Sequence, residues 1–256
     1  MIGTNAIKTK VGAGEEVFGI LNSLPLPLVS EMLGHAGYDF VVIDTEHQLV
    51  PPKDLEHAIR AAECAGIAPF VRVPLDDKGM IPRLLDMGAM GIVIPRVSTV
   101  AQARDAISTV RFPPLGHRGI TGGRNTGFGA LNLDAYMALA NTEVMLVLMI
   151  ENPEGLAALP EILALPGVDM VLEGALDLSI AMGHGSNVQH EAVQSALRTM
   201  ANHCADAGVP FCAIPRQVDQ LGAWRNAGVN VFLAGEDRGI VFRALQSHLH
   251  TLKFNI

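Results

Sequence analysis

Two acids and a histidine lie within four residues of one another where an apolar run ends, in the sequence Ile43-Asp44-Thr45-Glu46-His47. A histidine in such a place can act as a general base, directly or through a water molecule, when a carboxylate such as Asp44 fixes its tautomer. The alternative is that Asp44 caps a turn and His47 is a solvated loop residue. Glu46 allows the same two interpretations.

An arginine lies inside the apolar segment 70–74, whose sequence is FVRVP. An unpaired guanidinium would be costly in such a segment, so Arg72 is expected to have an anionic partner. That partner is either a structural carboxylate, such as Asp44, Glu46 or Glu151, or the oxyanion that develops on a substrate. One arginine can serve both purposes.

Two further carboxylates follow neighbouring apolar runs. Glu151 ends the run 144–150, and Asp177 comes shortly after the next run, 169–173. If the runs are adjacent strands, their ends can bring the two acids close enough to share one hard cation. Water and substrate oxygens would complete the octahedron that is usual for Mg²⁺ or Mn²⁺. The alternative for Asp177 is a helix N-cap.

These side chains need a scaffold that gathers the ends of several strands. Short apolar runs alternate with helical patterns along the whole chain, which is typical of βα units. The expected strands are residues 17–21, 40–44, 69–73, 91–95, 144–150, 169–173, 210–214 and 230–234, and helical patterns include 51–65, 76–87, 99–110 and 191–207. Eight such units in about 250 residues predict a single-domain (β/α)8 TIM barrel. A doubly wound open sheet is the alternative, but no G-x-G-x-x-G follows the first strand.

The lysines and one acidic segment narrow the chemistry. A Schiff-base enzyme needs a lysine inside the barrel, and none of the five lysines lies on an expected strand: Lys8, Lys10, Lys53, Lys78 and Lys253. A metal ion is therefore the expected electron sink. The segment 235–239 places two acids where barrel enzymes often bind phosphate, which favours substrates that bind through carboxylates.

Composition excludes several classes of partner. The 256 residues carry 18 Lys and Arg against 26 Asp and Glu, a formal charge of −8, which argues against nucleic acid and anionic membranes as partners. No signal peptide is evident, and no apolar run is long enough to span a membrane, so a cytoplasmic location is expected. The glycine-rich segment 116–129, with Arg118 and Arg124, is either an anion-gripping lid or a plain surface connection.

Taken together, the motifs resemble the HpcH/HpaI family of metal-dependent, class II aldolases over almost the whole chain. The resemblance is carried by the sequences YDFVVIDTEH at 38–47, VRVP at 71–74, LDMGA at 85–89, RG at 118–119, IE at 150–151 and DLS at 177–179 with MG at 182–183. It implies a (β/α)8 barrel over residues 1–256, in a homo-oligomer that is commonly a hexamer built as a trimer of dimers. The dimers swap their carboxyl-terminal helix, and Asp86 would reach a neighbour's site.

The resemblance also implies roles for the candidate residues. Glu151 and Asp177 would ligate Mg²⁺ or Mn²⁺, and Arg72 would stabilise an enolate oxygen. His47 with Asp44 would handle protons. The segment Gly174-Ala175-Leu176 would bind the substrate's carboxylate through backbone N–H groups at Leu176 and Asp177. The implied reaction cleaves or forms a carbon–carbon bond of a 2-oxo acid such as pyruvate, with an aldehyde as the second substrate.

Several positions depart from the usual aldolase pattern. Met149 stands where the family usually has Gln, Ala175 where it has Pro, and Glu173 where it has an apolar residue. The sequences CAIPR at 212–216 and EDRG at 236–239 differ as well. They resemble the branch that makes citrate for siderophore biosynthesis from oxaloacetate and acetyl-CoA, in which Arg72, Arg124 and Arg216 would bind extra carboxylates.

Three functions therefore remain, in this order: a metal-dependent 2-oxo acid aldolase, a citrate-forming synthase on the same site, and a non-catalytic barrel that binds a metabolite. The third is disfavoured because a barrel without chemistry has no need of a costly arginine among carboxylates.

Overall fold

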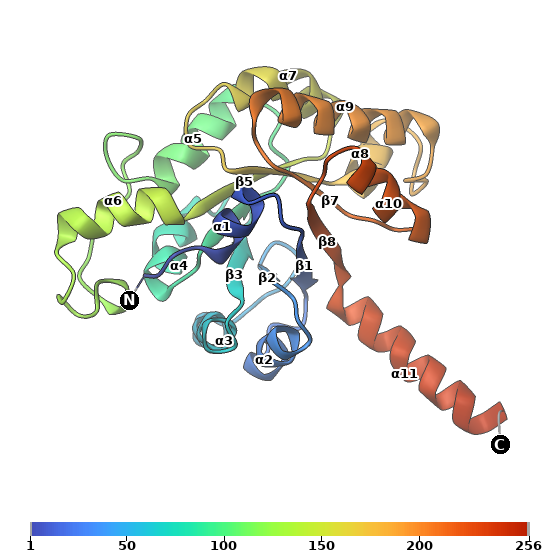
Figure 1. The fold of residues 1–256 in the computed structure, drawn as a ribbon, viewed down its shortest axis with the longest axis horizontal. Helices are drawn as coiled ribbons and strands as arrows, with labels where there is room; N and C mark the ends of the chain where they lie inside the picture. The colour runs from blue at the N-terminus through green and yellow to red at the C-terminus, as the bar shows by residue number, and fades with distance from the viewer. Residues whose placement is uncertain (1, 255–256) are drawn as a thin grey trace.

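The computed structural model describes residues 2–254, which form a closed barrel of eight parallel strands (Figure 1). Each strand pairs with the next along the chain, and β8 closes the barrel on β1. The strands are β1 (Val17–Asn22), β2 (Phe40–Asp44), β3 (Ala68–Arg72), β4 (Gly91–Ile94), β5 (Met145–Ile150), β6 (Met170–Glu173), β7 (Phe211–Ala213) and β8 (Val231–Glu236). The expected barrel is confirmed, and the open sheet is wrong.

Helices surround the barrel and follow the strands in alternation (Figure 1). The α-helices are α1 (Ala6–Gly12), α2 (Pro27–His35), α3 (Pro52–Cys64), α4 (Ile81–Met87), α5 (Val100–Val110), α6 (Leu133–Glu143), α7 (Pro153–Leu163), α8 (Ala175–Ala181), α9 (Glu191–Ala207), α10 (Val218–Asn226) and α11 (Asp237–Phe254). Two 3-10 turns are η1 (Lys78–Met80) and η2 (Arg124–Thr126). The helical pattern expected over 76–87 is thus divided into η1 and α4. Pro82 lies in the first turn of α4, the part of a helix where a missing N–H costs least.

The side chains of the strands alternate between two apolar clusters. One fills the barrel, and its buried members are Ile7, Val17, Phe40, Val42, Phe70, Val93, Met145, Val147, Met149, Met170, Leu172, Cys212, Val231 and Leu233. The other cluster lies between the strands and the helices. Strands buried on both faces explain why the sequence shows near-continuous apolar runs.

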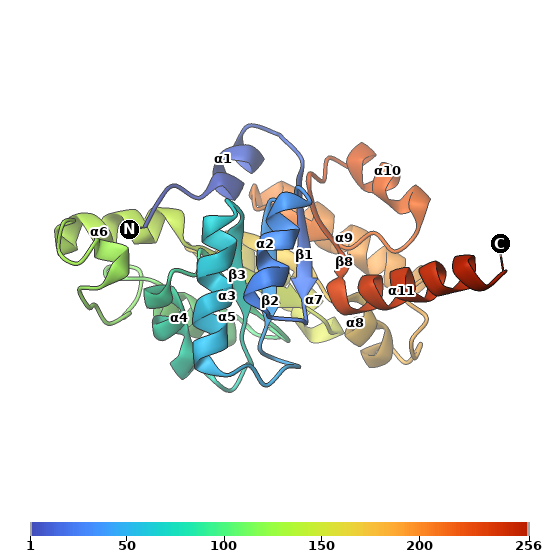
Figure 2. The same cartoon turned by 90° about the horizontal axis from the view of Figure 1, so that it is seen from below.

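The two ends of the barrel are different. Helix α1 lies at the amino-terminal end, and β1 runs away from it toward the other end (Figure 2). Ile7 of α1 is fully buried and belongs to the interior cluster, so this end is closed by an apolar side chain. The polar segments that follow the strands are therefore at the opposite, carboxyl-terminal end, where barrel enzymes place their chemistry.

Helix α11 begins on the barrel and then projects away from it (Figures 1 and 2). Its first residue, Asp237, is buried and accepts hydrogen bonds from Asn22 Nδ2 (2.6 Å) and the Ser23 N–H (2.8 Å). The apolar side chains farther along α11 are exposed, including Phe242 and Leu245. Nothing in the described part of this chain covers them.

None of the three cysteines is part of a disulfide. Cys64 is exposed, whereas Cys204 and Cys212 are buried, and all three are free thiols. Within residues 2–254, no helix combines the length and the apolar character needed to cross a bilayer.

Candidate active site

Arg72 and Asp44 form a buried two-point ion pair at the carboxyl ends of β3 and β2. The two residues are register partners on the paired strands. Arg72 Nε donates to Asp44 Oδ1 at 3.0 Å, and Nη2 lies 2.9 Å from Oδ2. Both side chains are almost completely buried. The expected anionic partner of Arg72 is therefore Asp44, and the pair offsets the cost of burying the guanidinium.

Asp44 also orders the turn that carries Glu46 and His47. Its Oδ1 atom accepts from the N–H groups of Glu46 (3.0 Å) and His47 (3.4 Å), which is the turn-capping role considered above. The imidazole of His47 does not face Asp44. Its Nε2 atom lies 3.7 Å from Glu46 Oε2, and the ring is largely exposed. Glu46 is therefore the acid nearest the imidazole, at a distance longer than a hydrogen bond.

The remaining nitrogen of Arg72 faces a sulfur atom. Nη1 is 3.9 Å from Met149 Sδ, a weak acceptor. Nε also lies 3.4 Å from Glu46 Oε2, so the carboxylates of Asp44 and Glu46 hold the other side of the guanidinium. Arg72 can thus keep its position and still donate from Nη1 to an oxygen atom of a ligand.

Glu151 follows β5 and is held by a backbone group that the sequence did not suggest. Its Oε2 atom accepts from the N–H of Arg96 at 2.6 Å. A β-carbon added to Gly174 would lie 2.3 Å from Glu151 Cγ, so glycine is what lets the end of β6 approach this carboxylate. Arg96 Nε is also 3.3 Å from Glu46 Oε1, which connects the ends of β2, β4 and β5.

The electrostatic environment of Glu151 favours a cation. Burial raises the pKa of Glu151 to about 7, although the Arg96 N–H acts in the opposite direction. The nearby charges of Asp177 and Glu46 raise the pKa further, and Arg72 lowers it. A positive charge placed between Glu151 and Asp177 would relieve the repulsion between these carboxylates.

Asp177 lies in the first turn of α8, and its side chain is exposed. Gly174 occupies the N-cap position of that helix, so the N-cap interpretation of Asp177 is wrong. Ala175 is buried and Leu176 is half exposed in the same turn. Within the described residues, no group of three or more His, Cys, Asp or Glu side chains gathers in metal-binding geometry. The ligand pair Glu151 and Asp177 stays a prediction.

An ion pair joins the end of β6 to the segment that follows β7. Glu173, the last residue of β6, is completely buried, and Arg216 Nη1 donates to its Oε2 at 2.9 Å. The N–H of Ile214 donates to Oε1 at 2.7 Å. Burial raises the pKa of Glu173 in spite of these donors. Glu173 precedes Gly174, so Arg216 is anchored one residue from the contact with Glu151.

Asp86 and Arg124 lie elsewhere. Asp86 Oδ1 accepts from Arg118 Nη2 at 2.9 Å, and Arg124 donates to the Met87 carbonyl (2.9 Å) and pairs with Glu63. Asp86 and Arg124 line a cavity of about 830 Å³ among α3, α4 and η2, and none of the residues around Glu151 lines it. This chain therefore does not bring Asp86 or Arg124 to its own candidate site. Hydrogen bonds also tie residues 116–129 to the outer helices, which supports a surface connection over a lid.

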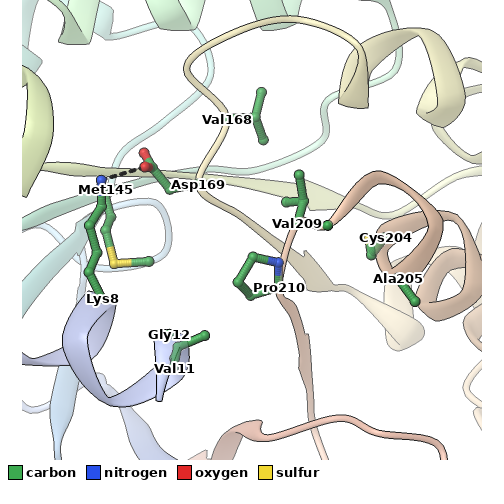
Figure 3. Close-up of a pocket in the computed structure, with 11 residues that line it drawn as sticks. Lys8, Val11, Gly12, Met145, Val168, Asp169, Cys204, Ala205, Val209 and Pro210 are labelled. Carbon is green, nitrogen blue, oxygen red and sulfur yellow. Dashed lines mark ion pairs between the residues drawn. The ribbon is translucent and has the colours of Figure 1, made fainter. Parts of the chain in front are cut away.

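A further cavity, of about 570 Å³, opens at the amino-terminal end of the barrel (Figure 3). Lys8 and Asp169, which line it, form an ion pair at 2.6 Å. Burial raises the pKa of Cys204, another lining residue, to about 12. This cavity has no free charge or reactive thiol and lies at the end away from Arg72 and Glu151, so we place no chemistry there.

Comparison with known proteins identifies the family. A family model described as HpcH/HpaI aldolase/citrate lyase matches residues 23–244. The chain belongs to this family. It is 33% identical to the 2-dehydro-3,6-dideoxy-6-sulfogluconate aldolase of Pseudomonas putida over 225 residues. The aligned segment covers 88% of each chain. It is 32% identical to the 2-keto-3-deoxy-L-rhamnonate aldolase of Escherichia coli O157:H7, over 98% of this chain and 94% of that one.

Solved structures add a second kind of relative. The crystal structure of citrate synthase SbnG superposes with a TM-score of 0.90 at 37% identity, over 96% of this chain and 97% of that one. The HpcH/HpaI resemblance, the barrel and the assignment to enzymes that cleave or form carbon–carbon bonds are confirmed. The hypothesis of a non-catalytic barrel is not supported, because the two aldolases and the citrate synthase named above are enzymes.

Sequence reasoning missed Arg96, and it paired His47 with Asp44, whereas the structure places Glu46 Oε2 3.7 Å from the imidazole. Arg96 comes two residues after β4, and its charge at a strand end was the available signal. Its contact with Glu151 runs through the backbone, which no residue type reveals. Asp44 and Glu46 are both carboxylates close to His47 in the sequence, so residue type does not show which of them lies nearer the imidazole. The conformation of the turn determines this.

Proposed function

We propose that this protein is a divalent-metal-dependent lyase or synthase that acts on 2-oxo acids through an enolate. The observation that carries the proposal is Glu151. It is a buried carboxylate with its pKa raised to about 7, one oxygen held by the Arg96 N–H and, among described residues, no protein donor on the other. That arrangement suits an oxygen ligand of a hard cation.

Glu151 and Asp177 would hold the cation, which is Mg²⁺ or Mn²⁺ in this proposal. Two carboxylates leave room for water and substrate oxygens, as is usual for these ions. When bound, the ion would act as a Lewis acid toward the carboxylate and carbonyl oxygens of the 2-oxo acid. The backbone at Gly174-Ala175-Leu176 would lie against the same substrate carboxylate.

Arg72 would stabilise the negative charge that develops on the carbonyl oxygen. Asp44 fixes the guanidinium from one side, and Nη1 is left beside the weak acceptor Met149. A donor that is already in place needs no reorganisation when the enolate oxygen forms, which makes it effective in a buried site.

His47 would transfer a proton to or from the oxygen atom of the second substrate, directly or through a water molecule. Its imidazole is exposed toward solvent and its Nε2 atom lies near Glu46. In the cleavage direction, His47 removes the hydroxyl proton of a 4-hydroxy-2-oxo acid, and the carbon–carbon bond breaks to give an aldehyde and the enolate of pyruvate. The enolate becomes pyruvate when its C3 atom takes up a proton. In the other direction, the enolate attacks the aldehyde carbonyl.

One observation favours a second candidate, a synthase that makes citrate from oxaloacetate and acetyl-CoA. Glu173 is completely buried and pairs with Arg216, and it precedes Gly174, which lies against Glu151. Arg216 remains a quarter exposed, so it could bind the extra carboxylate of oxaloacetate. The likeness to citrate synthase SbnG supports the same candidate.

Proton NMR in D₂O tests both candidates in one tube that contains the protein, Mg²⁺, oxaloacetate and acetyl-CoA. Citrate that forms only without a chelator would establish the synthase. Pyruvate that exchanges its methyl protons, with no citrate, would establish the aldolase. The absence of both signals in the presence of Mg²⁺ or Mn²⁺ would contradict the proposed chemistry.

Glu151→Gln and Glu154→Gln form a matched pair of variants for the same assay. Glu154 lies three residues away in the first turn of α7 and is exposed. We expect Glu151→Gln to lower turnover by about a hundredfold or more, because it removes a charged ligand of the ion. Glu154→Gln should keep wild-type turnover. Equal turnover in the two variants would refute the assignment of Glu151.

A further inference from the structure

Arg96, two residues after β4, has a left-handed backbone, with a φ of 52°. Among the non-glycine residues that the structure describes, Phe128 is the other with positive φ. A side chain with a β-carbon disfavours this conformation, so contacts around Arg96 must maintain it. Such residues concentrate at functional sites, where the surrounding structure holds them.

The contacts of the Arg96 backbone explain the conformation. The N–H of Arg96 donates to Glu151 Oε2 at 2.6 Å, and the N–H of Val97 donates to the Met149 carbonyl at 3.1 Å. In a regular strand, successive N–H groups point to opposite sides. Here both reach β5 or the residue that follows it, which requires the chain to leave the extended conformation at Arg96.

The side chain of Arg96 reaches the other acid of the site. Its Nε atom lies 3.3 Å from Glu46 Oε1, while the second oxygen of Glu46 faces Arg72 (3.4 Å) and His47 (3.7 Å). One residue therefore contacts the acid proposed to bind the cation and the acid that lies beside the proton-transfer histidine. Glu46 itself is buried, so a cationic neighbour is needed to stabilise its charge.

We propose that Arg96 is a positioning residue that acts through Glu151 and Glu46. Its left-handed backbone holds Oε2 of Glu151, so that the other oxygen is presented to the cation. Its guanidinium holds Glu46 in place beside Arg72 and His47. The identity of the cation rests on the proposed function, whereas the two contacts of Arg96 do not.

Three substitutions separate the backbone from the side chain. Arg96→Gly removes the guanidinium but keeps the N–H and allows positive φ at no steric cost. Arg96→Ala also keeps the N–H, but its β-carbon disfavours the conformation. Arg96→Lys keeps a positive charge. Arg104→Ala, on the exposed face of α5, is the control for the loss of a surface arginine.

Mn²⁺ affinity, measured by electron paramagnetic resonance, reports on the backbone contact. We expect Arg96→Gly to stay within about twofold of wild type and Arg96→Ala to bind about five- to tenfold more weakly, because alanine resists the left-handed conformation. Equal affinities for the two variants would overturn the backbone role, whether both match wild type or both are weakened.

Turnover reports on the guanidinium. Arg96→Gly should lower kcat by about tenfold with little change in Mn²⁺ affinity, since Glu46 loses one of its two arginine partners and is held less firmly beside His47. Arg96→Lys should recover part of that loss, which a merely structural role would not produce. Wild-type kcat in Arg96→Gly would overturn the side-chain role.

Urea unfolding in the presence of a chelator tests the backbone contact without any metal. Arg96→Gly should unfold at a higher urea concentration than Arg96→Ala. Adding Glu151→Met, which removes the acceptor, should shrink the difference between them. If wild type binds no Mn²⁺ but the difference shrinks, the proposed function fails and the positioning role stands. A difference that Glu151→Met leaves unchanged would overturn the positioning role.

Discussion

At the scale of single residues, Glu173 makes the stability of the protein depend on pH. Burial raises its pKa, so the folded chain binds the carboxyl proton more tightly than the unfolded chain does. Above the ordinary glutamate pKa of about 4.3, the unfolded chain loses this proton first, and the free energy of unfolding falls as pH rises toward the raised pKa. Glu173→Gln should remove this contribution and flatten the dependence. Urea unfolding between pH 4 and pH 8 measures it, with Glu154→Gln as the exposed control. An unchanged slope in Glu173→Gln would show that Glu173 does not titrate abnormally.

At the scale of elements, the junction of β5 and β6 depends on the missing side chain of Gly174. In Gly174→Ala the new β-carbon would lie 2.3 Å from Glu151 Cγ, so the carboxylate or β6 must move. A displacement of about 1 Å can cost about a hundredfold in rate, and we expect a loss of that order in kcat/KM together with weaker Mg²⁺ binding.

Gly222→Ala is the matched control for this change. Gly222 lies in α10 with open space around its β-carbon position, so alanine should be accepted there and add up to about 1 kcal/mol of stability. Steady-state kinetics and calorimetric titration with Mg²⁺ compare the two variants. If Gly174→Ala retains wild-type kinetics, the close approach of β6 to Glu151 does not matter for the reaction.

At the scale of the whole molecule, α11 leaves the barrel with an uncovered apolar stripe. Phe242, Leu245, Leu249 and Leu252 follow helical spacing and are 51% to 63% exposed. Because water disfavours such a stripe, we propose that α11 packs on another copy of the chain, as expected for subunits that swap this helix. The cavity lined by Asp86 and Arg124 then becomes a candidate for contact with a neighbouring subunit.

Charges placed on the stripe should separate the copies. Leu245→Asp with Leu249→Asp would bury two unpaired carboxylates in the proposed contact, and we expect light scattering after gel filtration to give a lower molar mass than for wild type. The control variant is Gln246→Asp with His250→Asp, which places the same charges at the same spacing one residue farther along the helix. The proposal would be refuted if the wild-type chain were monomeric or if the leucine variant kept the wild-type mass.

The pattern of residue types is enough to predict the barrel and the strand ends that carry the candidate site. Apolar runs at regular spacing predict buried parallel strands, because residues buried on both faces of a strand must nearly all be apolar. For the same reason Asp44, Arg72 and Glu151 stand out at the strand ends. Three contacts follow only from the folded chain: Glu46 lies near His47, the N–H of Arg96 donates to Glu151, and Glu173 pairs with Arg216. These contacts join residues far apart in sequence or depend on backbone torsions, and residue types record neither.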